Sequence, residues 1–175
     1  MKRQILFLIP VILIMLAFFA LQQRSLSAIE KIIAKEHPVP AISYQQLSEL
    51  YASDSVKKYV LFDVRRLDEF EKSHLQNAVR VAPDLPAEKF IQQFRNAIRD
   101  KRLIFYCSVG YRSSILAEKV DSLAREKGAL SLANLTGGIF RWYNENLPVF
   151  DANGETNAVH PYNAFWGKLL VKERN

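Results

Sequence analysis

Cys107 is the one cysteine in this 175-residue chain, and its neighbours favour a reactive thiol. It follows the apolar run 103–106, which is typical of a buried strand, and it opens a Cys-Ser-Val-Gly-Tyr-Arg-Ser loop that leads into a helical pattern. Backbone amides of such a loop converge at the helix N-terminus, where the helix dipole stabilises a thiolate. Gly110 permits the turn that points these amides inward, and Arg112 adds a fixed cation whose planar fork suits an oxyanion. The pattern therefore indicates a nucleophilic cysteine that acts on an anion.

Two other interpretations of Cys107 stay open at this point. Free cysteines are often small buried hydrophobes, in which case Arg112 is a surface residue. Thiol-dependent phosphatases and arsenate reductases also close a cysteine loop with arginine, but their loop is one residue longer than the four residues that separate Cys107 from Arg112. The smaller ring suits one extra sulfur better than a tetrahedral phosphate. A single cysteine excludes both an internal disulfide framework and a multi-cysteine zinc site.

Strand-like and helix-like segments alternate along the chain and carry Cys107 to one edge of a sheet. Ser43 and Gln46 form a capping-box pattern at the start of the first helix. The expected helices cover residues 44–51, 90–98, 113–127 and 139–146, and the expected strands cover residues 59–62, 78–82, 103–106 and 130–135. Such alternation predicts an α/β fold with a parallel sheet flanked by helices on both faces. Ligands of open α/β sheets bind beyond the carboxyl ends of the strands, which is where Cys107 stands.

Four sequence blocks, in order, resemble the single-domain rhodanese family over about residues 41–150. These blocks are Leu-Phe-Asp-Val-Arg at 61–65 with Glu-Phe at 69–70, Ser-His-Leu-Gln-Asn-Ala at 73–78, Cys-x-x-Gly-x-Arg-Ser at 107–113, and Asn-Leu-Thr-Gly-Gly at 134–138 with Trp at 142 and Leu-Pro-Val at 147–149. Ser73 and Asn77 stand where the family often has glycine, and both substitutions leave the cysteine loop intact. Blocks in this order are far more specific than any one of them.

The resemblance implies a rhodanese-like fold and a sulfurtransferase that needs no metal and no organic cofactor. Cys107 then takes sulfur from thiosulfate or a persulfide donor and passes it to a thiol or cyanide, while Arg112 guides the anionic donor and stabilises the departing sulfite. The residues that would bind the substrate, mostly through loop amides, are Ser108, Val109, Gly110, Tyr111 and Ser113. The residues that would support the loops from beneath are Asp63, Arg65 and Glu69. The alternative is a membrane-tethered module that carries or senses sulfur, or binds a protein, without catalysis.

The N-terminus predicts a membrane segment. Lys2 and Arg3 precede an uncharged apolar run at residues 5–21, which predicts an N-terminal hydrophobic helix before the α/β domain. Its length lies at the border between the apolar stretch of a signal peptide and a spanning helix. We therefore expect residues 1–24 to be a signal anchor or signal peptide, with the domain on the periplasmic or extracytoplasmic side, either anchored or exported after cleavage. Residues 25–40, which end in Pro38 and Pro40, are expected to be an extended linker.

The remaining features limit the partners. A turn signal at 151–154 begins a C-terminal extension, residues 151–175, whose aromatic residues are expected to fold back on the domain or to bind a partner. The net charge is +6, but the basic residues are spread along the chain and no nucleic-acid reader motif accompanies them, so we expect no nucleic-acid partner. The expected partners are a small anionic sulfur donor, a thiol or protein acceptor, and a membrane at residues 5–21.

Overall fold

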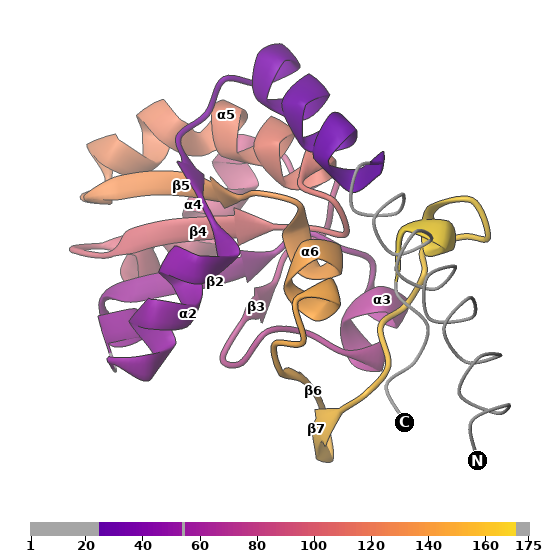
Figure 1. Ribbon diagram of the computed structural model, residues 1–175. Helices are drawn as coiled ribbons and strands as arrows, with labels where there is room; N and C mark the ends of the chain where they lie inside the picture. Colours follow the sequence, from indigo (N-terminus) through magenta and orange to yellow (C-terminus); the bar gives the residue numbers. More distant parts are fainter. Residues whose placement is uncertain (1–24, 54, 171–175) are drawn as a thin grey trace, which may run out of the picture.

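The computed structural model describes residues 25–53 and 55–170, and they form a parallel sheet covered by helices on both faces (Figure 1). The sheet has five strands in the order β1-β5-β4-β2-β3, and every neighbouring pair is parallel. The strands are β1 Ala41–Ile42, β2 Tyr59–Asp63, β3 Val79–Arg80, β4 Arg102–Tyr106 and β5 Ser131–Leu135. The predicted α/β class and parallel sheet are confirmed.

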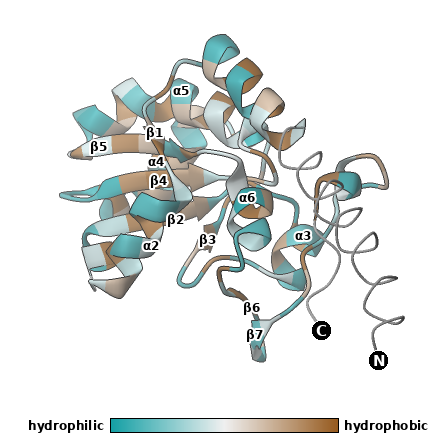
Figure 2. Ribbon diagram, viewed as in Figure 1, coloured by the Kyte–Doolittle hydropathy of each residue, from teal (hydrophilic) through white to brown (hydrophobic). Residues whose placement is uncertain are grey.

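The central strands are buried on both faces, which explains why their sequences are apolar runs and not alternating patterns. Phe62 of β2 is in register with Phe105 of β4, and their rings stack with centroids 5.2 Å apart. Successive side chains of a strand point to opposite faces, so Leu61 and Ile104 belong to the core on the other face of the sheet. Figure 2 shows the hydrophobic residues along these central strands.

Helices α4 Ala87–Ile98 and α5 Tyr111–Glu126 cover one face of the sheet, where Phe90 and Leu116 are buried. Helices α2 Tyr44–Ala52 and α6 Gly138–Asn144 cover the other face. The capping box that the sequence predicts at α2 is present, and Ser43 and Gln46 exchange their two hydrogen bonds. The short helix α3 Leu67–Lys72, which follows β2, was not predicted from the sequence.

The prediction of an extended linker is wrong for residues 25–36, which are helical. Leu26 and Ile33 are two turns apart on the same face of this helix, and both are buried in the core that contains α6. Arg141 of α6 pairs with Glu30 at 2.8 Å and donates a hydrogen bond to Ser27 Oγ at 2.9 Å. The apolar stripe of this segment therefore packs as part of the domain, and the extended stretch shortens to residues 37–40.

The C-terminal extension folds back on the domain. The hairpin of β6 Val149–Asp151 and β7 Gly154–Thr156 leads into it, and the 3-10 helix η2 Trp166–Leu169 lies near its end. Another 3-10 helix, η1 Ser55–Lys58, lies elsewhere in the domain, directly before β2. Trp166 packs against the α6 core as expected, whereas Phe165 is 70 % exposed.

The predicted membrane segment at residues 5–21 lies outside the described residues. Within residues 25–53 and 55–170, no helix combines the length and the apolar character that crossing a bilayer requires.

Candidate active site

Strand β4 places Cys107 directly beyond its carboxyl end, where the first turn of α6 holds the start of the loop. Ile139 N donates to Cys107 O at 2.9 Å, and Phe140 N donates to Ser108 O at 3.0 Å. Gly138 has a φ of 54°, and a Cβ built there would lie 2.2 Å from Cys107 O. Only glycine therefore allows α6 to approach the cysteine loop this closely.

The middle of the loop turns at Gly110, which caps the N-terminus of α5 with a φ of 100°. Its N–H donates to Cys107 Sγ at 3.2 Å. Its carbonyl oxygen accepts a hydrogen bond from Asn134 Nδ2 of β5 at 2.9 Å, and Ser113 Oγ donates to Asn134 Oδ1 at 2.7 Å. Asn134 thus fixes the turn that directs an amide at the sulfur, a role that the sequence did not predict for it.

Arg112 projects from the first turn of α5 onto the fully buried carboxylate of Glu69 in α3. Its Nη1 and Nη2 donate to the two oxygens of Glu69, each at 2.8 Å, and Nη2 also donates to Ser108 Oγ at 3.0 Å. Ser108 Oγ in turn donates to Glu69 Oε1 at 3.0 Å. The three side chains form a closed network beside Cys107.

The charges of this network are fixed by its geometry. Burial raises the pKa of Glu69, but the hydrogen bonds and charge of Arg112 outweigh it and lower the pKa to about 2. Burial lowers the pKa of Arg112, but Glu69 and the charge of Cys107 outweigh it and raise this pKa above its usual value. Arg112 is therefore a permanent cation within electrostatic reach of the thiolate. Its guanidinium is held in place by Glu69.

Asp63 and Arg65 lie beneath the site in a fully buried ion pair, with Arg65 Nη2 2.7 Å from Asp63 Oδ2. Arg65 also donates to Ser73 O at 2.6 Å and lies over the ring of Tyr106, with 5.9 Å from Cζ to the centroid. Leu75 N donates to the hydroxyl of Tyr106 at 3.0 Å. These contacts join the loop at 73–75 to Tyr106, the residue before Cys107.

The two remaining loop residues lie in different surroundings. Tyr111 is 46 % exposed, and its ring meets that of His37 edge-on with centroids 5.4 Å apart. Val109 is buried in the α6 core, so its side chain faces away from solvent and its backbone is the part left for a ligand. The structure therefore brings the predicted loop residues together, with the side chain of Tyr111 exposed and that of Val109 buried.

Tyr162 of the C-terminal extension is a site neighbour that the sequence did not predict. Its ring centroid lies 5.0 Å from Cζ of Arg112 and 5.2 Å from Cζ of Arg66. No local pattern links a residue after the hairpin to the start of α5, so only the tertiary contact reveals it.

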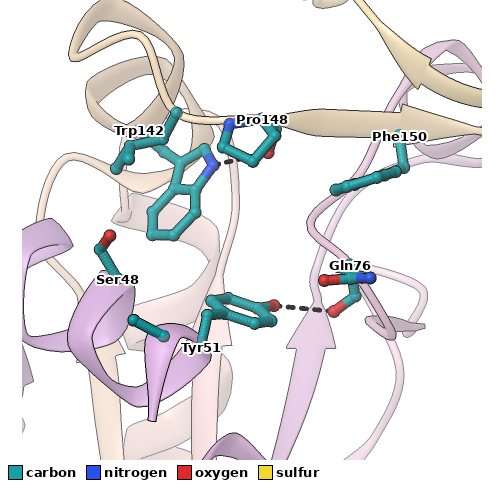
Figure 3. A pocket seen from close by; sticks show the side chains of 8 residues that line it. Ser48, Tyr51, Gln76, Trp142, Pro148 and Phe150 are labelled. Atoms are coloured by element: carbon teal, nitrogen blue, oxygen red, sulfur yellow. Dashed lines mark hydrogen bonds between the residues drawn. The ribbon is translucent and has the colours of Figure 1, made fainter. Parts of the chain in front are cut away.

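A separate cavity of about 300 Å³ lies between α2 and the β6 strand and does not include Cys107 (Figure 3). Trp142, Tyr51 and Phe150 line it, and Tyr51 donates a hydrogen bond to Gln76 O at 2.7 Å. Within the described part of the chain, no three His, Cys, Asp or Glu side chains cluster in a way that could hold a metal ion.

Known proteins are similar to this chain in sequence and in fold. The chain is 32 % identical over 112 residues to thiosulfate sulfurtransferase GlpE of Coxiella burnetii, an alignment that covers 63 % of this chain and 96 % of that protein. It is 28 % identical over 116 residues to the tRNA uridine(34) hydroxylase of Cronobacter sakazakii, of which it covers 31 %. The crystal structure of thiosulfate sulfurtransferase from Pseudomonas aeruginosa superposes with a TM-score of 0.54 and 19 % identity, covering 82 % of this chain and 26 % of that one, which shows a shared fold.

Residues 43–145, more than half of the chain, match the rhodanese-like domain as a family. This range contains strands β2 to β5, the cysteine loop and the Glu69–Arg112 network, whereas the helix at 25–36, strand β1 and the extension that carries Tyr162 lie outside it. The chain belongs to the rhodanese-like domain family.

Proposed function

We propose that this protein is a sulfurtransferase that carries sulfur as a persulfide on Cys107. The observation that carries the proposal is the Gly110 N–H directed at Cys107 Sγ at 3.2 Å, beside the cation of Arg112. A thiolate at this point receives a backbone hydrogen bond, the positive end of the α5 dipole and a guanidinium charge. The likeness to a thiosulfate sulfurtransferase over 96 % of that protein supports the same activity.

The reaction proceeds by double displacement. The Cys107 thiolate attacks the outer sulfur of thiosulfate or of a persulfide donor, and the sulfur–sulfur bond of the donor breaks. Sulfite or a thiolate leaves with the bonding electron pair, and Cys107 becomes a persulfide. An acceptor thiolate or cyanide then attacks the outer sulfur, and Cys107 leaves as the thiolate. No net oxidation occurs, so the cycle needs no redox cofactor.

Each residue of the network has a defined part in this cycle. The loop amides around Gly110 stabilise negative charge on the sulfur that is transferred, in the manner of an oxyanion hole. Arg112 supplies the positive charge that attracts an anionic donor and stabilises its leaving group. Glu69 and Ser108 are positioning residues, because they touch Arg112 and hold its guanidinium beside the thiol.

The test is the intact mass of the full chain before and after addition of thiosulfate, with Cys107→Ser as the control. We expect a gain of one sulfur, about 32 Da, that is lost again on addition of cyanide, and no gain in the control. A folded protein with a free thiol that gains no mass from thiosulfate contradicts thiosulfate as the donor. A gain that appears only with a protein persulfide donor identifies a dedicated sulfur carrier. A gain in the Cys107→Ser variant contradicts the site itself.

We further propose that residues 5–21 hold the domain at a membrane, with the site on the periplasmic or extracytoplasmic side. The uncharged run behind Lys2 and Arg3 supports this placement. The test is the fraction of the protein that stays in the membrane pellet after an alkaline wash, with the N-terminal residue of each fraction determined. Export after cleavage gives a shortened protein outside the membrane, and a washable protein with an intact N-terminus contradicts both placements.

A further inference from the structure

The chain that follows the β6–β7 hairpin crosses the outer side of the Cys107 site and is attached to α6 at both ends. Before the crossing, Tyr143 donates a hydrogen bond to Asn157 O at 2.6 Å, and Val159 is buried in the α6 core. After the crossing, Asn144 Nδ2 donates to Leu169 O at 2.7 Å, and the side chain of Leu169 is buried in the same core. The crossing segment, residues 159–169, is therefore held in place by the domain and is not a loose tail.

Tyr162 occupies a strained position in the crossing segment. Its φ of 63° lies in the left-handed region, which a bulky residue adopts rarely and at an energetic cost. Its N–H donates to His160 Nδ1 at 3.0 Å, and Nε2 of the same ring lies 3.8 Å from Asp68 Oδ2 of α3. Such strain persists only where the surroundings hold it, and here it aims the tyrosine ring at the active site.

The ring of Tyr162 covers two guanidinium groups that share one buried carboxylate. Arg112 Nη1 lies 2.8 Å and Arg66 Nε lies 3.5 Å from the same atom, Glu69 Oε2. The ring centroid lies 5.0 Å from Cζ of Arg112 and 5.2 Å from Cζ of Arg66, within the range of cation–π attraction. The negative face of the ring and the Glu69 carboxylate thus together offset the repulsion between the two guanidinium groups.

The burial of these groups shows that the ring forms the outermost layer. Cys107 is 1 % exposed, and Ser108 and Glu69, which bind Arg112 from the inside, are also buried. Tyr162 binds the same guanidinium from outside and is 37 % exposed. A sulfur donor that approaches the thiol along the outer side of Arg112 therefore meets this ring.

We propose that Tyr162 is a specificity-determining residue that admits slender sulfur donors to Cys107 and hinders bulky ones. Tyr162 lies outside the residues 43–145 that match the family, so this selection belongs to the extension of this chain. The choice among sulfur donors rests on the proposed function, whereas the steric cover over the thiol does not.

The variant that tests the proposal is Tyr162→Gly in the full chain. Glycine removes the ring and also adopts a φ of 63° without strain, so the variant is expected to keep its fold. Tyr162→Phe keeps the ring and is expected to behave as the wild type. Phe165→Ala removes an aromatic ring from the same segment at a site that is 70 % exposed, and it serves as the matched control.

The first readout is alkylation of Cys107, which as the single cysteine reports on the site alone. Rates are measured by intact mass with iodoacetamide, a slender reagent, and with N-(1-pyrenyl)maleimide, a bulky one. We expect Tyr162→Gly to raise the rate ratio of bulky to slender reagent about fivefold, the size expected when a ring held by cation–π contacts is removed. An unchanged ratio, or an equal rise in Phe165→Ala, contradicts the proposal.

The second readout is sulfur loading from thiosulfate and from benzenethiosulfonate, which carries the same reacting sulfur on a phenyl ring. We expect Tyr162→Gly to favour the aromatic donor by a similar factor in kcat/KM, and Tyr162→Phe to leave the preference unchanged. A wild type that loads no sulfur but shows the alkylation contrast contradicts the proposed function and leaves the role of Tyr162 intact. Normal loading with no contrast in either readout contradicts the role of Tyr162 alone.

Discussion

Glu69 is the residue on which the electrostatics of the site depend. It accepts hydrogen bonds from both Arg112 nitrogens, from Ser108 and from the backbone N–H of Arg66, although its carboxylate is fully buried. A buried charge is tolerated only when such partners replace its hydration. Glu69 therefore sets the place of the cation beside Cys107 without touching the sulfur itself.

The lowered pKa of Glu69 predicts a stability that depends on pH. The folded-state pKa of about 2 lies below the ordinary carboxyl pKa of 4.5, so the contribution of the ionised carboxylate is complete above pH 4.5 and is lost as the pH falls toward 2. We expect the difference in unfolding free energy between wild type and Glu69→Gln to shrink in that window by up to ~1.4 kcal/mol per pH unit. Urea unfolding from pH 6 to pH 2 measures it, with the exposed Glu71→Gln as control. A difference that is constant over this range contradicts the assignment.

The buried pair of Asp63 and Arg65 predicts a large loss of stability when one partner is removed. Both side chains are fully buried, and Arg65 also donates a hydrogen bond to the carbonyl oxygen of Ser73. Asp63→Ala leaves a guanidinium without its countercharge, and we expect a loss of about 3–5 kcal/mol in unfolding free energy. Urea unfolding at neutral pH measures it, and Asp68→Ala, at an exposed carboxylate of α3, is the control. A loss no greater than that of the control would show that the pair is dispensable.

The helix at residues 25–36 is an element of the domain, since its apolar side completes the core over α6. Leu26 is fully buried, whereas Ile32 on the same helix is 55 % exposed. We expect Leu26→Ala to lower the unfolding free energy by about 2–5 kcal/mol, and Ile32→Ala to change it by less than about 0.5 kcal/mol. Thermal or urea unfolding of both variants measures these changes. If the helix did not pack on the domain, both variants would lower the unfolding free energy by the same small amount.

The charge of the protein as a unit favours anionic substrates. The net charge is +6, and Arg66 and Arg112 lie together at the entrance to the thiol. We expect the rate at which anionic iodoacetate alkylates Cys107, divided by the rate for neutral iodoacetamide, to fall as salt is added. The reason is that the Debye screening length shortens from roughly 30 Å at 0.01 M to roughly 3 Å at 1 M ionic strength. The two reagents are nearly equal in size, so their rate ratio isolates charge. A ratio independent of salt contradicts electrostatic attraction at this entrance.

Local sequence pattern was sufficient to predict the central strands and the centre of the site. The short apolar runs at 59–62 and 103–106 predict buried parallel strands because such strands are covered on both faces. The order of strand, cysteine, glycine, arginine and helix places Cys107 and Arg112 at one sheet edge, because the carboxyl ends of parallel strands meet there. These features depend on residues close together in the chain, so a single sequence contains them.

Contacts between distant parts of the chain were decided by tertiary packing. The charge-rich segment 25–36 contains an apolar stripe that is buried only because it packs on the core beside α6. The guanidinium of Arg112 reaches Glu69 only because α3 lies beside the N-terminus of α5. Asn134 of β5 fixes the Gly110 turn, which follows the neighbouring strand β4. Tyr162 contacts Arg112 although it follows the β6–β7 hairpin in the sequence. Side-chain partners of this kind follow from which surfaces fit together after the core has formed. Residue type and spacing along the chain do not specify that fit, because the same side chains can satisfy their charges and hydrogen bonds in many other pairings.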